Sequence, residues 1–315
     1  MPKLEAVEAA LAGFRLIRRN PVSPAIWGLL TFVLTVAPLL VALPNLVAFM
    51  SELIAQAEAG GEPDMDQMMA MQFQWMAISP LLSLTALVAR ALVTGATFRA
   101  VLSPNESRWA FLRVSLGEVM IVVMGIVLGI IVVMAALVGG AAVGILAGLA
   151  SNVSAGAAVA AGLLAGLALV VGLIWLLLRL SLAIPASFAT RSFALGEGWR
   201  ISKGSALRLL LMVILMFVFV MLIETVIGGV VGLALIGGLL GSGLDEAAIE
   251  AFMAQPPETI VGVLTPWVIG IGLIGSLVGG YLLAIATAPW ADAYRQLSSA
   301  GPGPASEPAE AALAA

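Results

Sequence analysis

The sequence predicts an all-α, polytopic integral membrane protein with six transmembrane helices. Hydrophobic residues make up 62% of the chain and charged residues 10%, and the mean hydropathy is +1.13. This composition leaves too little polar surface to cover a water-soluble globule of this size, so lipid must be part of its solvent. The apolar runs are continuous, whereas a membrane barrel would show alternating segments of about 10 residues.

Six apolar stretches are long enough to cross a hydrocarbon layer of about 30 Å. They lie at about 24–48, 77–98, 117–149, 157–187, 207–240 and 264–288, within a transmembrane domain spanning residues 22–297. Residues 298–315 are rich in Pro, Gly and Ser and are predicted to form a disordered cytoplasmic tail.

Residues 1–21 are predicted to form an amphipathic helix on the inner leaflet. Arg15, Arg18 and Arg19 interrupt the first apolar run before it is long enough to span the membrane or to form a signal peptide. The stripe expected to be buried consists of Leu4, Val7, Leu11, Phe14 and Ile17.

A weak internal repeat predicts that the six spans form three hairpins, each preceded by a cytoplasmic surface helix. An aromatic, a basic and an aliphatic residue occur together at 14–17, 111–114 and 199–201, before the first, third and fifth spans. The alternative is that any juxtamembrane segment on the cytoplasmic side collects aromatic residues and arginine.

The distribution of charge predicts the orientation of the chain. The fourteen basic residues lie before the first span, in alternate loops, after the sixth span, or within the second and fourth spans. The other loops carry only acidic residues, within 52–66 and 245–258, or no charge, at 151–154. Because positive residues stay in the cytoplasm, both termini are predicted to lie inside, with the protein in a bacterial inner membrane.

The residue types that are missing exclude most chemistry. The chain has no His and no Cys, so it lacks the residues for Ser-His proteolysis, thiol catalysis, haem ligation through His or Cys, and the usual zinc sites. Its four Asp residues lie in loops or at a helix end, which excludes a paired-aspartate site within the bilayer. We therefore expect neither an enzyme nor a bound cofactor or metal, and no basic stripe indicates a nucleic-acid partner.

Two arginines within the spans are the most informative residues. Arg90 precedes Arg99 by nine residues, and Arg179 precedes Phe188 by nine, which places both about 13 Å from the inner surface. They therefore lie in one layer, near the level expected for Glu118. An arginine at the centre of a span costs about 2.5 to 3.5 kcal/mol on insertion scales, so both are predicted to face the bundle interior.

Two interpretations of this layer remain open. In the structural one, Glu118 and helix carbonyls neutralise both arginines and fix the register of three helices. In the functional one, the excess positive charge binds the phosphate head group of an anionic phospholipid. The candidate head-group residues are Arg90, Arg179, Glu118, Trp199 and Lys203.

A single carboxyl group lies deeper still. Glu224 follows Arg208 by sixteen residues, which places it about 24 Å from the inner surface, with no basic residue at its own depth. It is expected to be either a hydrogen-bonding packing residue or a proton-coupled site.

Two segments, WLLLRLSLAIPA at 175–186 and GWRISKG at 198–204, resemble a bacterial family of polytopic domains related to the membrane domain of glycerophosphodiester phosphodiesterases. The residues that match position by position are Arg179, Pro185, Trp199 and Lys203. Where that family carries a soluble phosphodiesterase domain, the resemblance implies lipid-derived substrates. This chain has no such domain and no His for its metal-dependent chemistry, so the resemblance supplies no catalytic residue.

The sequence thus leaves two functional hypotheses. The first is a non-enzymatic protein that binds or transports an anionic lipid or amphiphile through the arginine layer. The alternative is a membrane scaffold or assembly factor that acts through a membrane-protein partner, with the arginine layer purely structural.

The predicted topology can be tested with single cysteines, because the chain has none of its own. A membrane-impermeant maleimide applied to intact spheroplasts is expected to label Glu62→Cys and to leave Ser299→Cys unlabelled until the membrane is broken. The reverse pattern would invert the orientation and remove the basis of the shared arginine layer.

Overall fold

The computed structural model describes residues 4–58, 65–105, 108–242, 251–252 and 254–298. All regular structure within these residues is helical. Six of the helices are long and apolar enough to cross a membrane, so the chain is a multi-pass membrane protein. This confirms the predicted all-α class and the six spans.

The helices follow one another with short connections. The amino-terminal helices α1 (Ala6–Ala10) and α2 (Ala12–Arg19) precede α3 (Val22–Glu58) and α4 (Met65–Leu102). The short helix η1 (Arg108–Phe111) leads into α5 (Leu116–Ser151), which turns directly into α6 (Ala155–Leu180). The remaining helices are α7 (Ala183–Thr190), α8 (Leu195–Ile201), α9 (Ala206–Ser242) and α11 (Pro257–Ser298).

The fourth predicted span, 157–187, is divided between α6 and α7. Pro185 has no N–H with which to continue the hydrogen bonding of α6. It lies instead in the first turn of α7, where a backbone N–H needs no partner within the helix. The break lets α7 leave the direction of α6 and pack beneath the base of α5.

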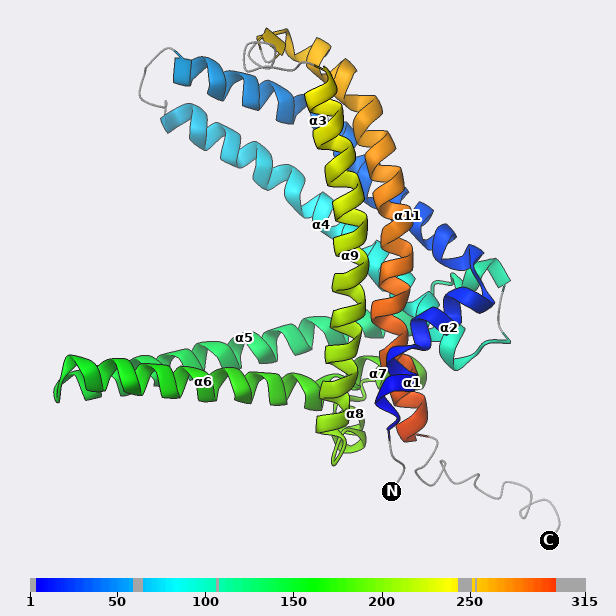
Figure 1. Cartoon of the computed structure of the whole chain (residues 1–315), viewed down its shortest axis with the longest axis vertical. Helices are drawn as coiled ribbons and strands as arrows, with labels where there is room; N and C mark the ends of the chain where they lie inside the picture. Colours follow the sequence, from blue (N-terminus) through cyan, green and yellow to red (C-terminus); the bar gives the residue numbers. More distant parts are fainter. Residues whose placement is uncertain (1–3, 59–64, 106–107, 243–250, 253, 299–315) are drawn as a thin grey trace.

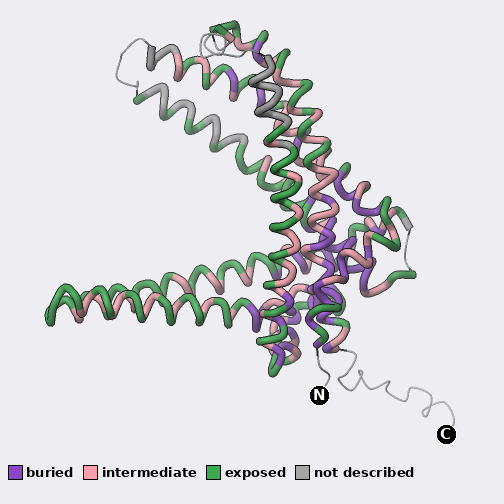
Figure 2. Tube along the Cα trace, viewed as in Figure 1, coloured by how far each residue is buried: buried purple, intermediate pink, exposed green. Residues whose placement is uncertain are grey.

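The long helices form two groups (Figure 1). α11 packs along α3 and also contacts α4 and α9, whereas α5 and α6 pack on each other as an arm that points away from α3 and α9. Burial is concentrated where the base of this arm meets α7, α2 and the end of α11 (Figure 2). Most side chains along the arm are exposed, and α5 has the highest hydropathy of the six spans, 3.2. The apolar surface of the arm is therefore available to lipid.

The contact between α3 and α11 depends on glycine. A side-chain carbon on Gly28 would lie 2.6 Å from the carbonyl oxygen of Ser276, and one on Gly280 would lie 2.7 Å from the amide nitrogen of Gly28. Both positions must lack a side chain because backbone packs directly on backbone. By contrast, the regularly spaced glycines of the arm at 140, 144 and 148 face open space, as do those at 275 and 279.

The predicted amphipathic helix at residues 1–21 is two helices, interrupted at Leu11. The face that packs on α9 and α11 includes Ala9 and Ala10, which are fully buried, whereas Val7 of the predicted stripe is 56% exposed. The small alanines allow α1 to lie close against the protein. An ion pair adds to this contact, because Arg15 of α2 lies 3.2 Å from the buried carboxylate of Asp292 in α11.

No surface helix of the predicted kind precedes the third span. Trp109, Ala110 and Phe111 instead adopt left-handed backbone angles, with φ of 53°, 54° and 63°. This conformation costs roughly 1 to 2 kcal/mol for each L-residue, so neighbouring contacts must hold it. The indole of Trp27 donates to the carbonyl oxygen of Ala110 at 2.8 Å, and Arg99 donates to that of Phe111 at 2.7 Å.

Some sequence predictions lie outside the described residues. These are the disordered tail from residue 299 onward and the acidic loop residues Glu62, Asp64, Asp245, Glu246 and Glu250.

Neighbouring glycines of α11 provide a matched test of the contact between α3 and α11. Gly280→Ala is expected to lower the free energy of unfolding by about 1 to 3 kcal/mol, because the added carbon meets the α3 backbone. Gly279→Ala adds the same methyl group in open space and is expected to leave stability unchanged or slightly higher. The measurement is thermal unfolding of the purified protein in detergent, and equal melting temperatures for the two variants would contradict the contact.

Candidate functional site

A buried ion pair connects α4 to the start of α5. The guanidinium of Arg99, in the last turn of α4, contacts the carboxylate of Glu118, in the first turn of α5, and the two residues are 7% and 4% exposed. Gly95, one turn earlier in α4, leaves the space that the Glu118 carboxylate occupies. Phe188 of α7 covers the pair, with its ring centre 5.5 Å from the guanidinium carbon of Arg99.

Both partners of this pair have all their main interactions within the protein. Glu118 accepts hydrogen bonds from the backbone N–H of Ser115 at 2.8 Å and from its hydroxyl at 2.7 Å, in a capping box that begins α5. Arg99 also donates to the carbonyl oxygens of Phe111 and Arg113. A bound ligand would therefore have to displace existing bonds to reach either group.

Glu118 does not neutralise the two arginines with which the sequence analysis grouped it. Its ion pair is with Arg99, and no ion pair joins it to Arg90 or Arg179 among the residues that the structure describes. The sequence carried a signal for this, since Ser115 and Glu118 have the spacing of a capping box at the start of an apolar run.

Arg179 is enclosed by aromatic rings instead. It lies at the end of α6, is 8% exposed, and has its guanidinium carbon 4.5 Å from the ring centre of Trp199 and 5.9 Å from that of Trp175. The two indoles meet edge to face, with ring centres 5.6 Å apart. One guanidinium nitrogen donates weakly to the hydroxyl of Ser202 at 3.4 Å, and the Nε atom is buried without a partner. These contacts join α6 to α8 and fit a structural role.

The predicted head-group residues are therefore separated into several places. Trp199 of α8 lies on Arg179, Glu118 lies on Arg99, and Lys203 is exposed beyond the end of α8. Arg90 alone of the predicted set lines a cavity.

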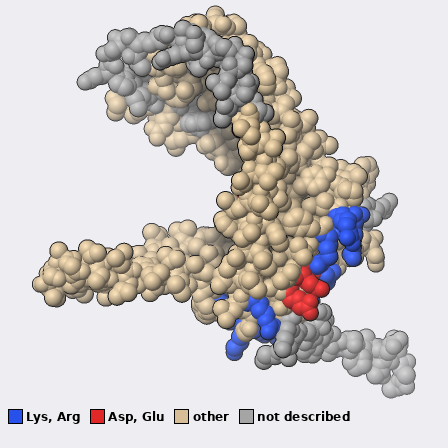
Figure 3. All heavy atoms as spheres, viewed as in Figure 1, with Lys and Arg blue, Asp and Glu red and all other residues tan. Residues whose placement is uncertain are grey.

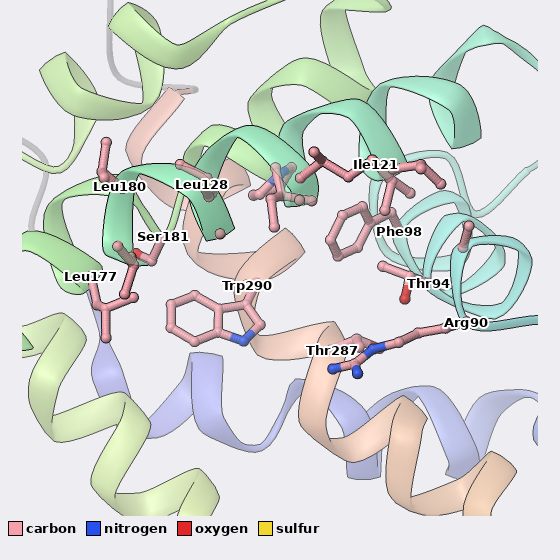
Figure 4. Close-up of a pocket in the computed structure, with 18 of the residues that line it drawn as sticks. Arg90, Thr94, Phe98, Ile121, Leu128, Leu177, Leu180, Ser181, Thr287 and Trp290 are labelled. Atoms are coloured by element: carbon pink, nitrogen blue, oxygen red, sulfur yellow. The ribbon is translucent and has the colours of Figure 1, made fainter. Parts of the chain in front are cut away.

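This cavity lies where the α5–α6 arm meets α4, α9 and α11, and its volume is about 950 Å³ (Figure 4). Its walls are mainly Leu, Ile, Val and Gly, contributed by α4, α5, α6, α7, α9 and α11. Among the described residues that line it, Arg90 carries the single charge. The cavity is thus an apolar space within the membrane-spanning region with one cation in its wall.

Three hydrogen-bond donors in the wall have no partner. Arg90 makes no hydrogen bond or ion pair with any residue that the structure describes, and the same holds for the hydroxyl of Thr94 and the indole nitrogen of Trp290. The donor atoms of Thr94 and Trp290 are not sealed inside the protein, because the buried unpaired atoms of the described chain comprise the Nε of Arg179 alone. In Figure 4 the guanidinium of Arg90 and the indole nitrogen of Trp290 lie on the same side of the cavity.

Two other polar residues of the wall are already bonded. The hydroxyl of Thr287 donates to the carbonyl oxygen of Leu283 at 2.6 Å, and that of Ser181 donates to Leu178 at 2.8 Å. The donors open to a ligand therefore come from α4 and α11 only.

Sequence reasoning identified Arg90 but not Thr94 or Trp290. Arg90 and Thr94 are four residues apart, which places them on one face of α4. That spacing was a usable signal. The proximity of Trp290 was not, because it depends on how α11 packs against α4.

Glu224 lies on an exposed position of α9, and no described residue bonds to it. The structure thus gives no contact to support a packing role for this carboxyl group.

The charged side chains on the face shown in Figure 3 gather at one end of the molecule. Basic residues cover α2 and the region of α8, with acidic residues on α1 between them, and the arm carries none on this face. The ends of the described chain lie at the same end of the molecule (Figure 1).

Comparison of the chain with protein-family models, with curated proteins and with solved structures found no match. The resemblance to the membrane domain of glycerophosphodiester phosphodiesterases remains a prediction.

Stability measurements can separate the paired arginine from the unpaired one. Glu118→Ala is expected to lower the free energy of unfolding by about 3 to 5 kcal/mol, because it leaves the buried Arg99 cation without its carboxylate. Arg90→Gln removes a cation that has no partner and is expected not to lower stability. Thermal unfolding of both variants in the same detergent checks this, and a Glu118→Ala protein as stable as wild type would show that the pair does not hold α4 to α5.

Proposed function

We propose that this protein binds an anionic lipid or a similar amphiphile in the cavity around Arg90, and transports or presents it without changing it chemically. The observation that carries the proposal is an unpaired guanidinium in an apolar cavity of a membrane-spanning region. Arginine keeps its positive charge even when buried, so the cavity favours a negatively charged occupant.

The cost of leaving Arg90 without an anion supports this proposal. An arginine within a span costs about 2.5 to 3.5 kcal/mol, and arginines in such positions commonly pair with another group or face a water-filled space. The described chain supplies no carboxylate to Arg90, whereas it supplies one to Arg99 and two aromatic rings to Arg179. A bound anion would supply the missing partner.

The apolar walls favour an occupant with hydrocarbon tails over a small inorganic anion. The cavity wall continues onto the exposed apolar surface of the α5–α6 arm, where lipid is the expected solvent. A lipid could thus keep its tails in hydrocarbon while its head group reaches Arg90.

The proposed setting is a bacterial inner membrane, with the base of the molecule in the cytoplasm. The concentration of basic residues in the predicted cytoplasmic segments supports this orientation. A binding function without catalysis agrees with a cavity whose described lining contains one charged residue and no carboxylate, in a chain that has neither His nor Cys.

Arg90→Gln is expected to reduce the amount of anionic phospholipid that copurifies with the protein. A hydrogen bond to a charged group contributes about 1.5 to 3 kcal/mol, so the affinity should fall roughly 10- to 100-fold. The measurement is the lipid bound per protein by native mass spectrometry, after extraction from membranes of one composition.

Arg200→Gln is the matched control, because it removes an exposed cation of α8 outside the cavity. Equal lipid binding by the wild type and by both variants would contradict the proposal. It would favour the alternative of a scaffold that acts through a protein partner.

A further inference from the structure

We infer that the ligand of this cavity carries a phosphodiester head group with a single negative charge, bound jointly by Arg90, Thr94 and Trp290. This inference rests on the proposed function and specifies the chemical class of its ligand. It starts from the three donors that face the cavity without partners.

The donors belong to two helices that lie against each other. Arg90 and Thr94 are on one face of α4, and Trp290 projects from α11, which contacts α4. Figure 4 shows the guanidinium and the indole nitrogen directed into the same part of the cavity. None of the three groups can accept a hydrogen bond from another in place of a ligand except the Thr94 hydroxyl, so they need acceptors from outside the chain.

The charge of the head group follows from the charge of the wall. Arg90 is the single charged residue among the described residues lining the cavity, so one negative charge on the ligand neutralises it. A phosphate monoester carries nearly two negative charges at neutral pH and would leave an excess charge in an apolar space. A zwitterionic head group would bring a cation for which the described wall has no carboxylate.

The shape of the head group follows from the directions of the donors. A carboxylate is planar, and a guanidinium can bind both of its oxygens side by side. A phosphodiester is tetrahedral, so its oxygens can meet donors that approach from α4 and from α11 in different directions. Tryptophan and threonine donors beside an arginine therefore fit a phosphodiester better than a carboxylate.

The size of the cavity indicates a lipid rather than a soluble phosphodiester. Its volume of about 950 Å³ lies at the upper end of the range of roughly 300 to 1,000 Å³ for small-molecule sites. Leu, Ile and Val residues make up most of the wall beyond the three donors, which suits the upper parts of acyl chains.

The test compares four lipids with identical dioctanoyl tails by native mass spectrometry of the whole protein in detergent. They are phosphatidylglycerol, phosphatidylcholine, the hemisuccinate of dioctanoylglycerol and dioctanoylglycerol itself. Phosphatidylglycerol is expected to bind best, with the carboxylate lipid and the zwitterionic lipid each about tenfold weaker and the neutral lipid weakest.

Three variants test the named donors, each removing one donor while keeping the approximate size of the side chain. Arg90→Gln, Trp290→Phe and Thr94→Val are each expected to weaken phosphatidylglycerol binding about tenfold or more. Thr287→Val is the matched control, because its hydroxyl already donates to Leu283 and should contribute nothing. Thermal unfolding shows whether each variant is folded, and Thr94→Val keeps the test valid if Trp290→Phe does not fold.

The outcomes distinguish this inference from the proposed function. If Arg90→Gln weakens binding while Trp290→Phe and Thr94→Val bind like wild type, or if the carboxylate lipid binds as well as phosphatidylglycerol, the inference is overturned and the proposed function stands. If Arg90→Gln binds every lipid like wild type, both are overturned.

Discussion

The buried ion pair between Arg99 and Glu118 is the constraint on which the rest of the structure depends. It joins the end of α4 to the start of α5, and the same arginine holds the left-handed turn of η1 through the carbonyl oxygen of Phe111. The α5–α6 arm leaves the rest of the protein at this point, and the cavity lies beside it. Removing either charge would leave the other buried without compensation, which costs more than the pair itself contributes.

Three arginines near the membrane show how the surroundings of one residue type decide its role. Arg99 has a carboxylate, Arg179 has two indole rings, and Arg90 has no partner in the described part of the chain. The first two are less than 10% exposed, whereas Arg90 is exposed to the cavity. A cation whose interactions are complete stabilises the fold, and a cation whose interactions are incomplete is available to a ligand. The functional proposal rests on this difference and not on the depth that Arg90 and Arg179 share.

Hydropathy predicted the six spans because each is a continuous apolar run, and the charge pattern singled out Arg90 as unusual. Hydropathy and depth do not report how a helix is rotated, and this is why the partner of Glu118 was misassigned. Arg90 and Arg99 are nine residues apart, which is about half a turn away from a common face of α4. The position of Trp290 could not be predicted for a related reason, since it depends on the packing of α11 against α4. The close contact of α3 with α11 was equally hidden, because the glycines that form it do not follow the spacing seen in the arm.

The pairing of α3 with α11 has a consequence for biosynthesis. Arg15 and Asp292, which join across this contact, are 277 positions apart, so the ribosome must make nearly the whole described chain before they can meet. Until then, the glycine-lined face of the first span has no protein partner and must be covered by lipid or by the insertion machinery. The chain therefore completes its core only when its last span enters the membrane, and a ribosome that stalls before that point would release a product lacking its central contact.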